Sequence, residues 1–188
     1  MATNKIGWCD TTWNPVTGCS PVSDGCRSCW ARRMSKRLAG RAGYPPAPDN
    51  FKVTLHPDRL DQPLHWREPR RVFVVSMGDL FHEDVPDGFI QEVLHVILCC
   101  QKHTFLILTK RAQRMHNYFR EKCGEIYCRM DNLHLGVSVE NQATADERIP
   151  WLLKTPAVKR FVSAEPLLAA IDFSEYFNPI CDVHHSRT

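Results

Sequence analysis

From residue 71 onward, short apolar runs alternate with amphipathic stretches, a pattern typical of parallel β/α units. The run at 71–75 is of the kind found in strands buried on both faces. The expected strands are 71–75, 105–108, 133–139 and 159–162, and the expected helices between them are 89–102, 112–121 and 143–153. Because strands that alternate with helices need crossover connections, we predict an α/β fold with one parallel sheet.

The first 70 residues are less regular. Residues 11–15 predict a short strand, and 27–39 predict a helix that Gly40 ends, with Trp30, Met34 and Leu38 at four-residue spacing. The other side of this helix is basic, and we interpret it as a solvated face, with a phosphate-binding strip as the alternative. Its cations are Arg32, Arg33, Lys36 and Arg37, with Arg41 just beyond. A proline-rich loop is expected at 43–50, and a short helix or turns around Leu60, Leu64 and Trp66 are expected at 56–70.

Length and composition favour one folded domain over residues 1–188. The 188 residues carry a net charge of +3 from mixed signs, so the overall balance demands no polyanionic partner. Residues 1–12 contain no apolar run of a signal peptide, and no stretch is long enough to span a membrane. Nine cysteines without a secretory signal therefore predict a cytoplasmic protein whose thiols are free or bind metal.

Three of the cysteines lie in a loop at residues 16–30 that is rich in glycine, proline and serine. Cys19, Cys26 and Cys29 have C-x6-C-x2-C spacing, and the C-x2-C pair is the spacing at which two sulfurs reach one metal. Three local thiolates on an iron–sulfur cluster would leave one iron open. A structural zinc site wants four ligands, for which Cys9 is available. Both metals agree with the pattern.

Each predicted strand is followed by a hydroxyl residue and then by a charged one. Since the carboxyl ends of parallel strands lie on one face, these residues predict a shared polar basin with the cysteine loop at its rim. The basin contains Asp79, Lys110, Arg111, Glu140 and Glu165, together with Ser76, Ser138, Asn141 and Ser163. Its mixed charge suits a ligand with an amine, a carboxylate and hydroxyls. By contrast, we interpret His82 and Glu83 as surface residues, and Cys99 and Cys100 as helix packing.

Six ordered motifs resemble a phage and bacterial family of unassigned function. They are WNPVTGC at 13–19, VSDGCRSC at 22–29, SMGDLFHE at 76–83, LTKR at 108–111, LGVSVEN at 135–141 and FVSAEPLL at 161–168. That family in turn resembles radical S-adenosylmethionine enzymes. The second resemblance implies a partial (β/α) barrel, with β/α units over about 71–171. Family members are longer, so the resemblance implies a C-terminally incomplete barrel with a tail at 174–188.

The same resemblance implies a set of cofactors. Cys19, Cys26 and Cys29 would hold a four-iron, four-sulfur cluster that binds S-adenosylmethionine, receives an electron from a donor protein and starts radical chemistry on an unknown substrate. Among the basin residues that the strand ends bring together, the candidate catalytic residues are Lys110, Glu140 and Glu165, and the candidate cofactor-binding residues are Ser76, Asp79, Ser138, Asn141 and Ser163. The usual loop of radical S-adenosylmethionine enzymes has C-x3-C-x2-C spacing. Here the first gap, between Cys19 and Cys26, is six residues long instead of three.

Two other interpretations of the sequence stay open. One is a non-enzymatic module stabilised by zinc on Cys9, Cys19, Cys26 and Cys29, with the basic helix binding nucleic acid. The other is an inactive, truncated member of the family. Iron content would separate the radical enzyme from the zinc module, because the two require different metals at the same loop.

Overall fold

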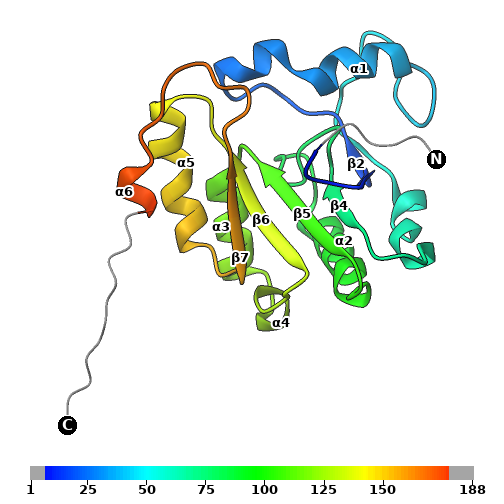
Figure 1. The fold of residues 1–188 in the computed structure, drawn as a ribbon. Helices are drawn as coiled ribbons and strands as arrows, with labels where there is room; N and C mark the ends of the chain where they lie inside the picture. Colours follow the sequence, from blue (N-terminus) through cyan, green and yellow to red (C-terminus); the bar gives the residue numbers. More distant parts are fainter. Residues whose placement is uncertain (1–6, 178–188) are drawn as a thin grey trace.

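The computed structural model describes residues 7–177, and its centre is a five-stranded parallel sheet with strand order β1-β4-β5-β6-β7 (Figure 1). The strands are β1 (Thr11–Trp13), β4 (Arg71–Val74), β5 (Thr104–Thr109), β6 (Leu133–Ser138) and β7 (Lys159–Ser163). Neighbouring strands pair in parallel throughout, for example Val74 opposite Ile107. The predicted α/β class and the four predicted strands are therefore confirmed, and the sheet is a partial (β/α) barrel.

Three helices connect the strands and cover one face of the sheet (Figure 1). They are α2 (Asp87–Cys99), α3 (Ala112–Glu121) and α5 (Gln142–Lys154), and two short helices, α4 (Glu125–Cys128) and α6 (Ser174–Phe177), lie outside this layer. The apolar stripe of α2 packs on the sheet, with Ile90, Val93 and Ile97 fully buried. The predicted packing of the cysteine pair holds for Cys100, which is buried, but is wrong for Cys99, which is exposed at the helix end.

The opposite face of the sheet is only half covered, which corrects the expectation for the run at 71–75. Burial alternates along β4 and β5, because the helices lie on one side only and the other side is the inside of an open barrel. Phe73 and Phe161 lie on this inner face, and the Trp8 ring packs beside them at centroid distances of 4.7 and 6.3 Å. Trp8 thereby covers part of the inner face that no helix reaches.

Most of the chain between β1 and β4 builds a cap over the carboxyl ends of the strands, whereas residues 62–66 return toward the amino ends, where Trp66 packs on His103 just before β5. This part of the chain contains a small antiparallel pair, β2 (Val16–Thr17) with β3 (Thr54–Leu55), the 3-10 helices η1 (Asp24–Ser28), η2 (Pro57–Arg59) and η3 (Gln62–His65), and the helix α1 (Trp30–Leu38). The turns predicted at 56–70 are thus confirmed, and the strand predicted at 11–15 ends two residues earlier. In Figure 1, α1 lies above the sheet, at the opposite side from α4.

Helix α1 buries only part of its predicted apolar stripe, because Met34 and Leu38 are half-buried against the rest of the cap whereas Trp30 is exposed. Ala31 and Ser35 are buried, whereas Trp30 is 53% exposed. Short side chains let the helix approach Tyr44 and Met77 closely, and together they form a small second core. The basic side chains of α1 are exposed, as predicted for a solvated face.

None of the helices within residues 7–177 is long and apolar enough to cross a membrane. The predicted tail at 174–188 begins with α6, and its remaining residues, 178–188, lie outside the described part of the chain. The assignment of residues 1–188 to one domain stays a prediction.

Candidate functional site

A cavity of about 520 Å³ lies where the cysteine loop covers the carboxyl ends of the parallel strands. The loop and the strand ends line it from opposite sides. From the loop come Cys19, Cys26 and Cys29, and from the strand ends come Ser76, Asp79, Lys110, Ser138 and Glu165. Eight of the residues predicted from the sequence therefore surround one space, at the edge of the sheet where α/β proteins place their sites.

Glycine at position 18 allows the loop to leave the sheet beside β4. Gly18 has φ +85° and forms a bridge with Gly78, and a Cβ at Gly18 would lie 2.2 Å from the carbonyl oxygen of Lys52. Asn14 fastens the turn after β4, because its Oδ1 accepts hydrogen bonds from Ser76 Oγ (3.2 Å) and Met77 N (2.9 Å). Only glycine fits at position 18, because a side chain there would collide with the backbone of Lys52.

Arg111 joins the start of the cysteine loop to the end of β5. Its Nη1 donates to Cys19 Sγ at 3.4 Å and its Nη2 donates to Ser20 Oγ at 2.9 Å, while its Nε donates to both carboxylate oxygens of Glu83. The side chain is 5% exposed. Although burial opposes ionisation, Asp79 and Cys19 raise the pKa of Arg111, so the guanidinium stays charged.

Asp79 holds this arginine in place. One carboxylate oxygen accepts from Thr109 Oγ1 at 2.7 Å, and the other accepts from Arg111 Nη1 at 3.2 Å. The backbone amides of Phe81 and Lys110 also donate to it. With both oxygens occupied inside the protein, Asp79 organises the strand ends from the wall of the cavity.

His82 is buried, which corrects its interpretation as a surface residue. Its Nδ1 accepts from the amide of Asp84 at 3.1 Å, so its Nε2 donates to Ser20 Oγ at 2.7 Å. Burial and the nearby Arg111 lower the pKa of His82, which keeps the ring neutral. Glu83 is exposed as predicted, yet it binds Arg111. The turn after β4 therefore supports the loop at Ser20.

A second group of charges supports the loop around Cys26. Glu140 is fully buried, and its Oε1 accepts from Ser23 Oγ at 2.7 Å and from Lys110 Nζ. Arg148 lies behind it, with Nη1 3.4 Å from the same oxygen. Lys110 Nζ also lies 3.9 Å from Cys26 Sγ. Although burial opposes it, hydrogen bonds from Lys110 and Ser23 lower the pKa of Glu140, so its carboxylate is ionised.

The three sulfurs have different surroundings, each with a donor nearby. Burial, and then the charge of Asp79, raise the pKa of Cys19 to about 11, against the opposing effect of Arg111. At Cys26, burial is outweighed by hydrogen bonds from the backbone of Val22 and Ser23, so its pKa is lowered. Cys29 is the N-cap of α1, and its Sγ accepts from the amide of Arg32 at 3.5 Å. At Cys26 these donors favour the thiolate, the form in which cysteine binds metals.

The donor set therefore fits a thiolate-bound cluster in its chemistry: three sulfurs facing one cavity, with Arg111, Lys110 and a helix N-terminus beside them. Within residues 7–177, no three Cys, His, Asp or Glu side chains are gathered closely enough to enclose a single metal ion. Cys9 is buried before β1, whereas Cys19 follows β2, so the two lie at opposite ends of the first strand.

Four residues predicted for the basin do not line the cavity, and one of them is Arg111, which holds the cysteine loop as described above. Asn141 caps α5, where its Oδ1 accepts from the amide of Thr144 at 3.0 Å. Glu140 lies behind the loop, and Ser163 pairs with Ser138 in the sheet. Ser138 lines the cavity and also donates to the carbonyl oxygen of Glu165 at 2.8 Å. These differences follow from side-chain direction, which strand-end position alone does not define.

Sequence reasoning missed the residues that hold the loop rather than line the cavity. Asn14, Ser20, Ser23 and Arg148 all make such contacts. Asn14, Ser20 and Ser23 stand beside the cysteine motif, which is the one signal that could have drawn attention to them. Arg148 lies in the middle of α5 and carries no local signal, because its partner is eight residues away and buried.

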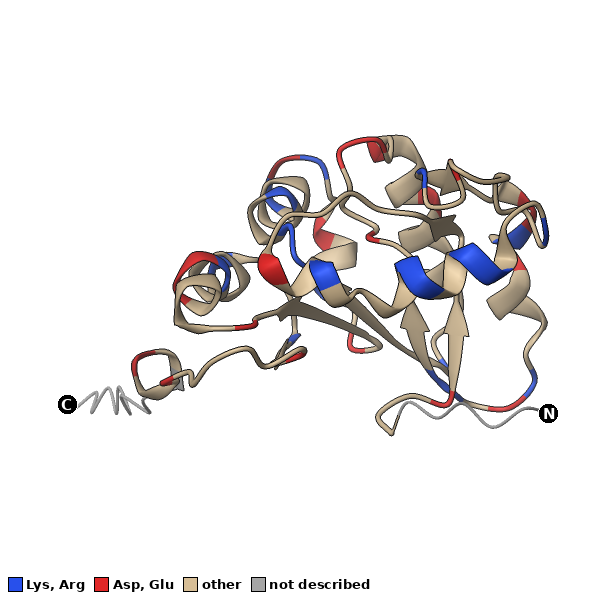
Figure 2. Cartoon of the chain, turned by 90° about the horizontal axis from the view of Figure 1, so that it is seen from above, with Lys and Arg blue, Asp and Glu red and all other residues tan. Residues whose placement is uncertain are grey.

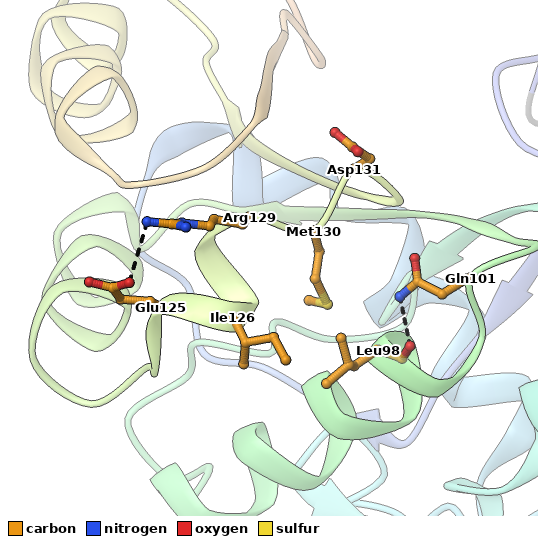
Figure 3. Close-up of a pocket in the computed structure, with 7 residues that line it drawn as sticks. All are labelled: Leu98, Gln101, Glu125, Ile126, Arg129, Met130 and Asp131. Carbon is orange, nitrogen blue, oxygen red and sulfur yellow. Dashed lines mark hydrogen bonds and ion pairs between the residues drawn. The ribbon is translucent and has the colours of Figure 1, made fainter.

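A second cavity, of about 450 Å³, lies at the opposite side of the sheet between the end of α2 and α4 (Figure 3). Leu98, Ile126 and Met130 point toward one another there, and Glu125 forms an ion pair with Arg129 at 3.4 Å. None of the predicted site residues lines it. It therefore adds nothing to the cysteine site.

Fold and site together define an α/β protein with a partial (β/α) barrel and a cysteine-lined cavity at the carboxyl ends of its strands. The chain belongs to the DUF5131 family, a protein family of unknown function, whose match spans residues 3–181. No curated protein matches the sequence. A mutant of spore photoproduct lyase has a similar fold, with a TM-score of 0.53, 12% sequence identity and 85% of this chain covered. The chain spans 46% of the length of that structure.

Proposed function

We propose that the chain binds a four-iron, four-sulfur cluster through Cys19, Cys26 and Cys29, and S-adenosylmethionine in the adjoining cavity, as a radical S-adenosylmethionine enzyme. The observation that carries the proposal is the shared cavity, which joins three cysteines of one loop to polar residues from four parallel strands. When bound, the cluster would supply the electron and the open iron that this chemistry requires.

The side chains around the sulfurs support this use of the loop. A cluster held by thiolates carries negative charge, and Arg111 and Lys110 place positive charge next to Cys19 and Cys26. Both cations are held by buried carboxylates, Asp79 and Glu140. They would therefore stay in position when the three thiols lose their protons and bind the cluster. These four charged residues act as positioning residues for the loop.

The remaining cavity residues suit the polar end of the cofactor. Glu165 is exposed at the mouth and carries a carboxylate that can accept hydrogen bonds from an amine, while Ser76 and Ser138 contribute hydroxyls. Phe73 and Leu108 add apolar surface to the lining of the cavity beside these polar groups. The likeness in fold to spore photoproduct lyase supports the partial barrel that the radical resemblance implies, and nothing finer.

The test is metal analysis of protein purified and reconstituted without oxygen. We expect brown protein with about four irons per chain, and loss of the iron in Cys26→Ala. The matched control is Cys99→Ala, which removes an exposed cysteine far from the loop and should keep the iron. Wild-type iron content in Cys26→Ala would refute the assignment of the cluster to this loop.

Two further measurements complete the test. The reduced, reconstituted protein should cleave S-adenosylmethionine to 5′-deoxyadenosine, and Cys26→Ala should not. One zinc per chain in place of iron, lost equally in Cys9→Ala and Cys26→Ala, would favour the zinc module instead. If the protein holds iron but does not cleave S-adenosylmethionine, the assignment of the cluster stands and the assignment as a radical enzyme is refuted.

A further inference from the structure

The exposed side of α1 carries positive charge that the chain does not neutralise. Arg32, Arg33, Lys36 and Arg37 are all exposed, and the sequence from 25 to 48 contains no acidic residue. Within residues 7–177 none of these four side chains forms an ion pair, whereas other exposed arginines do, such as Arg71 with Asp10 at 3.1 Å. Figure 2 shows the resulting blue bands along the helix.

This basic helix begins at the mouth of the cysteine cavity. Cys29 caps it, and the next residue, Trp30, lines the cavity while remaining 53% exposed. Arg33 and Arg37 follow Trp30 at spacings of three and seven residues, so the three side chains share one side of the helix. An exposed aromatic ring therefore stands between the cavity and a row of cations.

A smaller polar hollow of about 400 Å³ lies on the neighbouring side of the same helix. Arg32, Lys36 and Lys52 bring three cations to it, and Asp49 is the acidic residue in its lining. Phe51 belongs to both this hollow and the cysteine cavity, and the guanidinium of Arg32 lies 5.7 Å from its ring centre. Cations and aromatic rings thus alternate across the surface that leads into the site.

We propose that this surface binds single-stranded nucleic acid as the substrate of the proposed radical site, with phosphates along α1 and a base stacked on Trp30. The inference rests on the proposed function for what happens in the cavity. Single-strand binding surfaces combine a basic track with aromatic rings on which bases stack, as here. An acidic protein would use the cations but would have no need of an exposed tryptophan at the mouth of the cavity.

The first test measures binding of a fluorescent 15-nucleotide single-stranded DNA by anisotropy at several salt concentrations. In Arg33→Gln/Arg37→Gln we expect weaker binding and a slope of log affinity against log salt that is smaller by about 1.4, because two phosphate contacts are lost. The control, Lys122→Gln/Lys159→Gln, removes the same charge from exposed positions at the other end of the sheet and should bind as the wild type. Equal losses in both variants would refute a specific surface.

The second test concerns the base. Trp30→Ala should weaken binding of the 15-mer by roughly five-fold or more, and Trp30→Phe should restore most of it. An abasic strand with the same phosphates should bind the wild type and Trp30→Ala alike. If Trp30→Ala binds the 15-mer normally, or if an acidic polypeptide competes as well as the DNA, the nucleic-acid proposal is wrong.

Iron content separates this inference from the proposed function. Arg33→Gln/Arg37→Gln should retain its iron, because neither side chain contacts the loop sulfurs. Cys26→Ala should lose iron and still bind the strand through α1. Absence of iron in the wild type would refute the cluster, and normal strand binding by Arg33→Gln/Arg37→Gln would refute this surface.

Discussion

The side chain of Glu140 occupies the space next to Gly25, so that a Cβ at position 25 would lie 2.7 Å from the carboxyl carbon. Gly25 is buried in η1, between Cys19 and the two later cysteines. The buried carboxylate at the end of β6 therefore supports the cysteine loop by direct packing as well as through Ser23. A glycine is required here by close approach and not by backbone conformation.

This packing predicts that Gly25→Ala disturbs the loop. The new methyl group would have to displace Glu140 or lift the loop, which moves the sulfurs on either side of it. We expect reduced iron content after anaerobic reconstitution, with the thermal unfolding midpoint lowered. Gly88→Ala is the control, because nothing lies within 4 Å of a Cβ there and alanine favours a helix. Full iron in Gly25→Ala would show that the loop tolerates the shift.

Glu140→Gln should destabilise the whole protein. It removes a buried negative charge from between Lys110 and Arg148, which leaves two cations without their shared partner. Breaking a buried pair in this way costs about 3 kcal/mol or more. Chemical denaturation would measure the loss of free energy of unfolding. The control is Glu147→Gln, which changes a side chain on α5 next to Arg148 that is 68% exposed. This variant should leave the free energy of unfolding nearly unchanged.

The same carboxylate predicts an acid-sensitive stability. The pKa of Glu140 is lowered from 4.5, so its contribution is complete above pH 4.5 and is lost as the pH falls through the lower folded-state value. The free energy of unfolding of the wild type should therefore fall more steeply below pH 4.5 than that of Glu140→Gln. Parallel pH profiles for the two proteins would contradict the lowered pKa.

In metal-free protein the cysteines should differ in reactivity. The lowered pKa of Cys26 makes it a better nucleophile than Cys19, whose pKa is about 11. At pH 8, iodoacetamide should modify Cys26 before Cys19, as measured by mass spectrometry of peptides over time. Lys110→Gln should slow the reaction of Cys26, because it removes a cation near the sulfur. Faster labelling of Cys19 would overturn the assignment.

Arg111→Lys should weaken metal retention while keeping the charge. Lysine cannot replace the contacts that the guanidinium makes at once with Cys19, Ser20, Asp79 and Glu83. We expect faster loss of iron to a chelator than in the wild type. Arg114→Lys is the matched control, since Arg114 contacts Val85 and Asp87 away from the loop. Equal rates of iron loss in the two variants would show that the positive charge at position 111 is enough to retain the metal.

The sequence by itself determined the parallel α/β fold, the positions of the four long strands and the grouping of the cysteines with polar strand ends. It could do so because short apolar runs alternate with amphipathic helices along the chain and because parallel strands finish at one edge. Local patterns of this kind need no knowledge of distant contacts.

Only the tertiary structure decided which polar residues face the cavity and which hold the loop. Asn141 turned out to cap α5, His82 to be buried against Ser20, and Arg148 to contact Glu140. Likewise, helix α1 buries Ala31 and leaves Trp30 exposed. Each outcome depends on side-chain direction and on partners far away in the sequence, which hydrophobic periodicity does not encode.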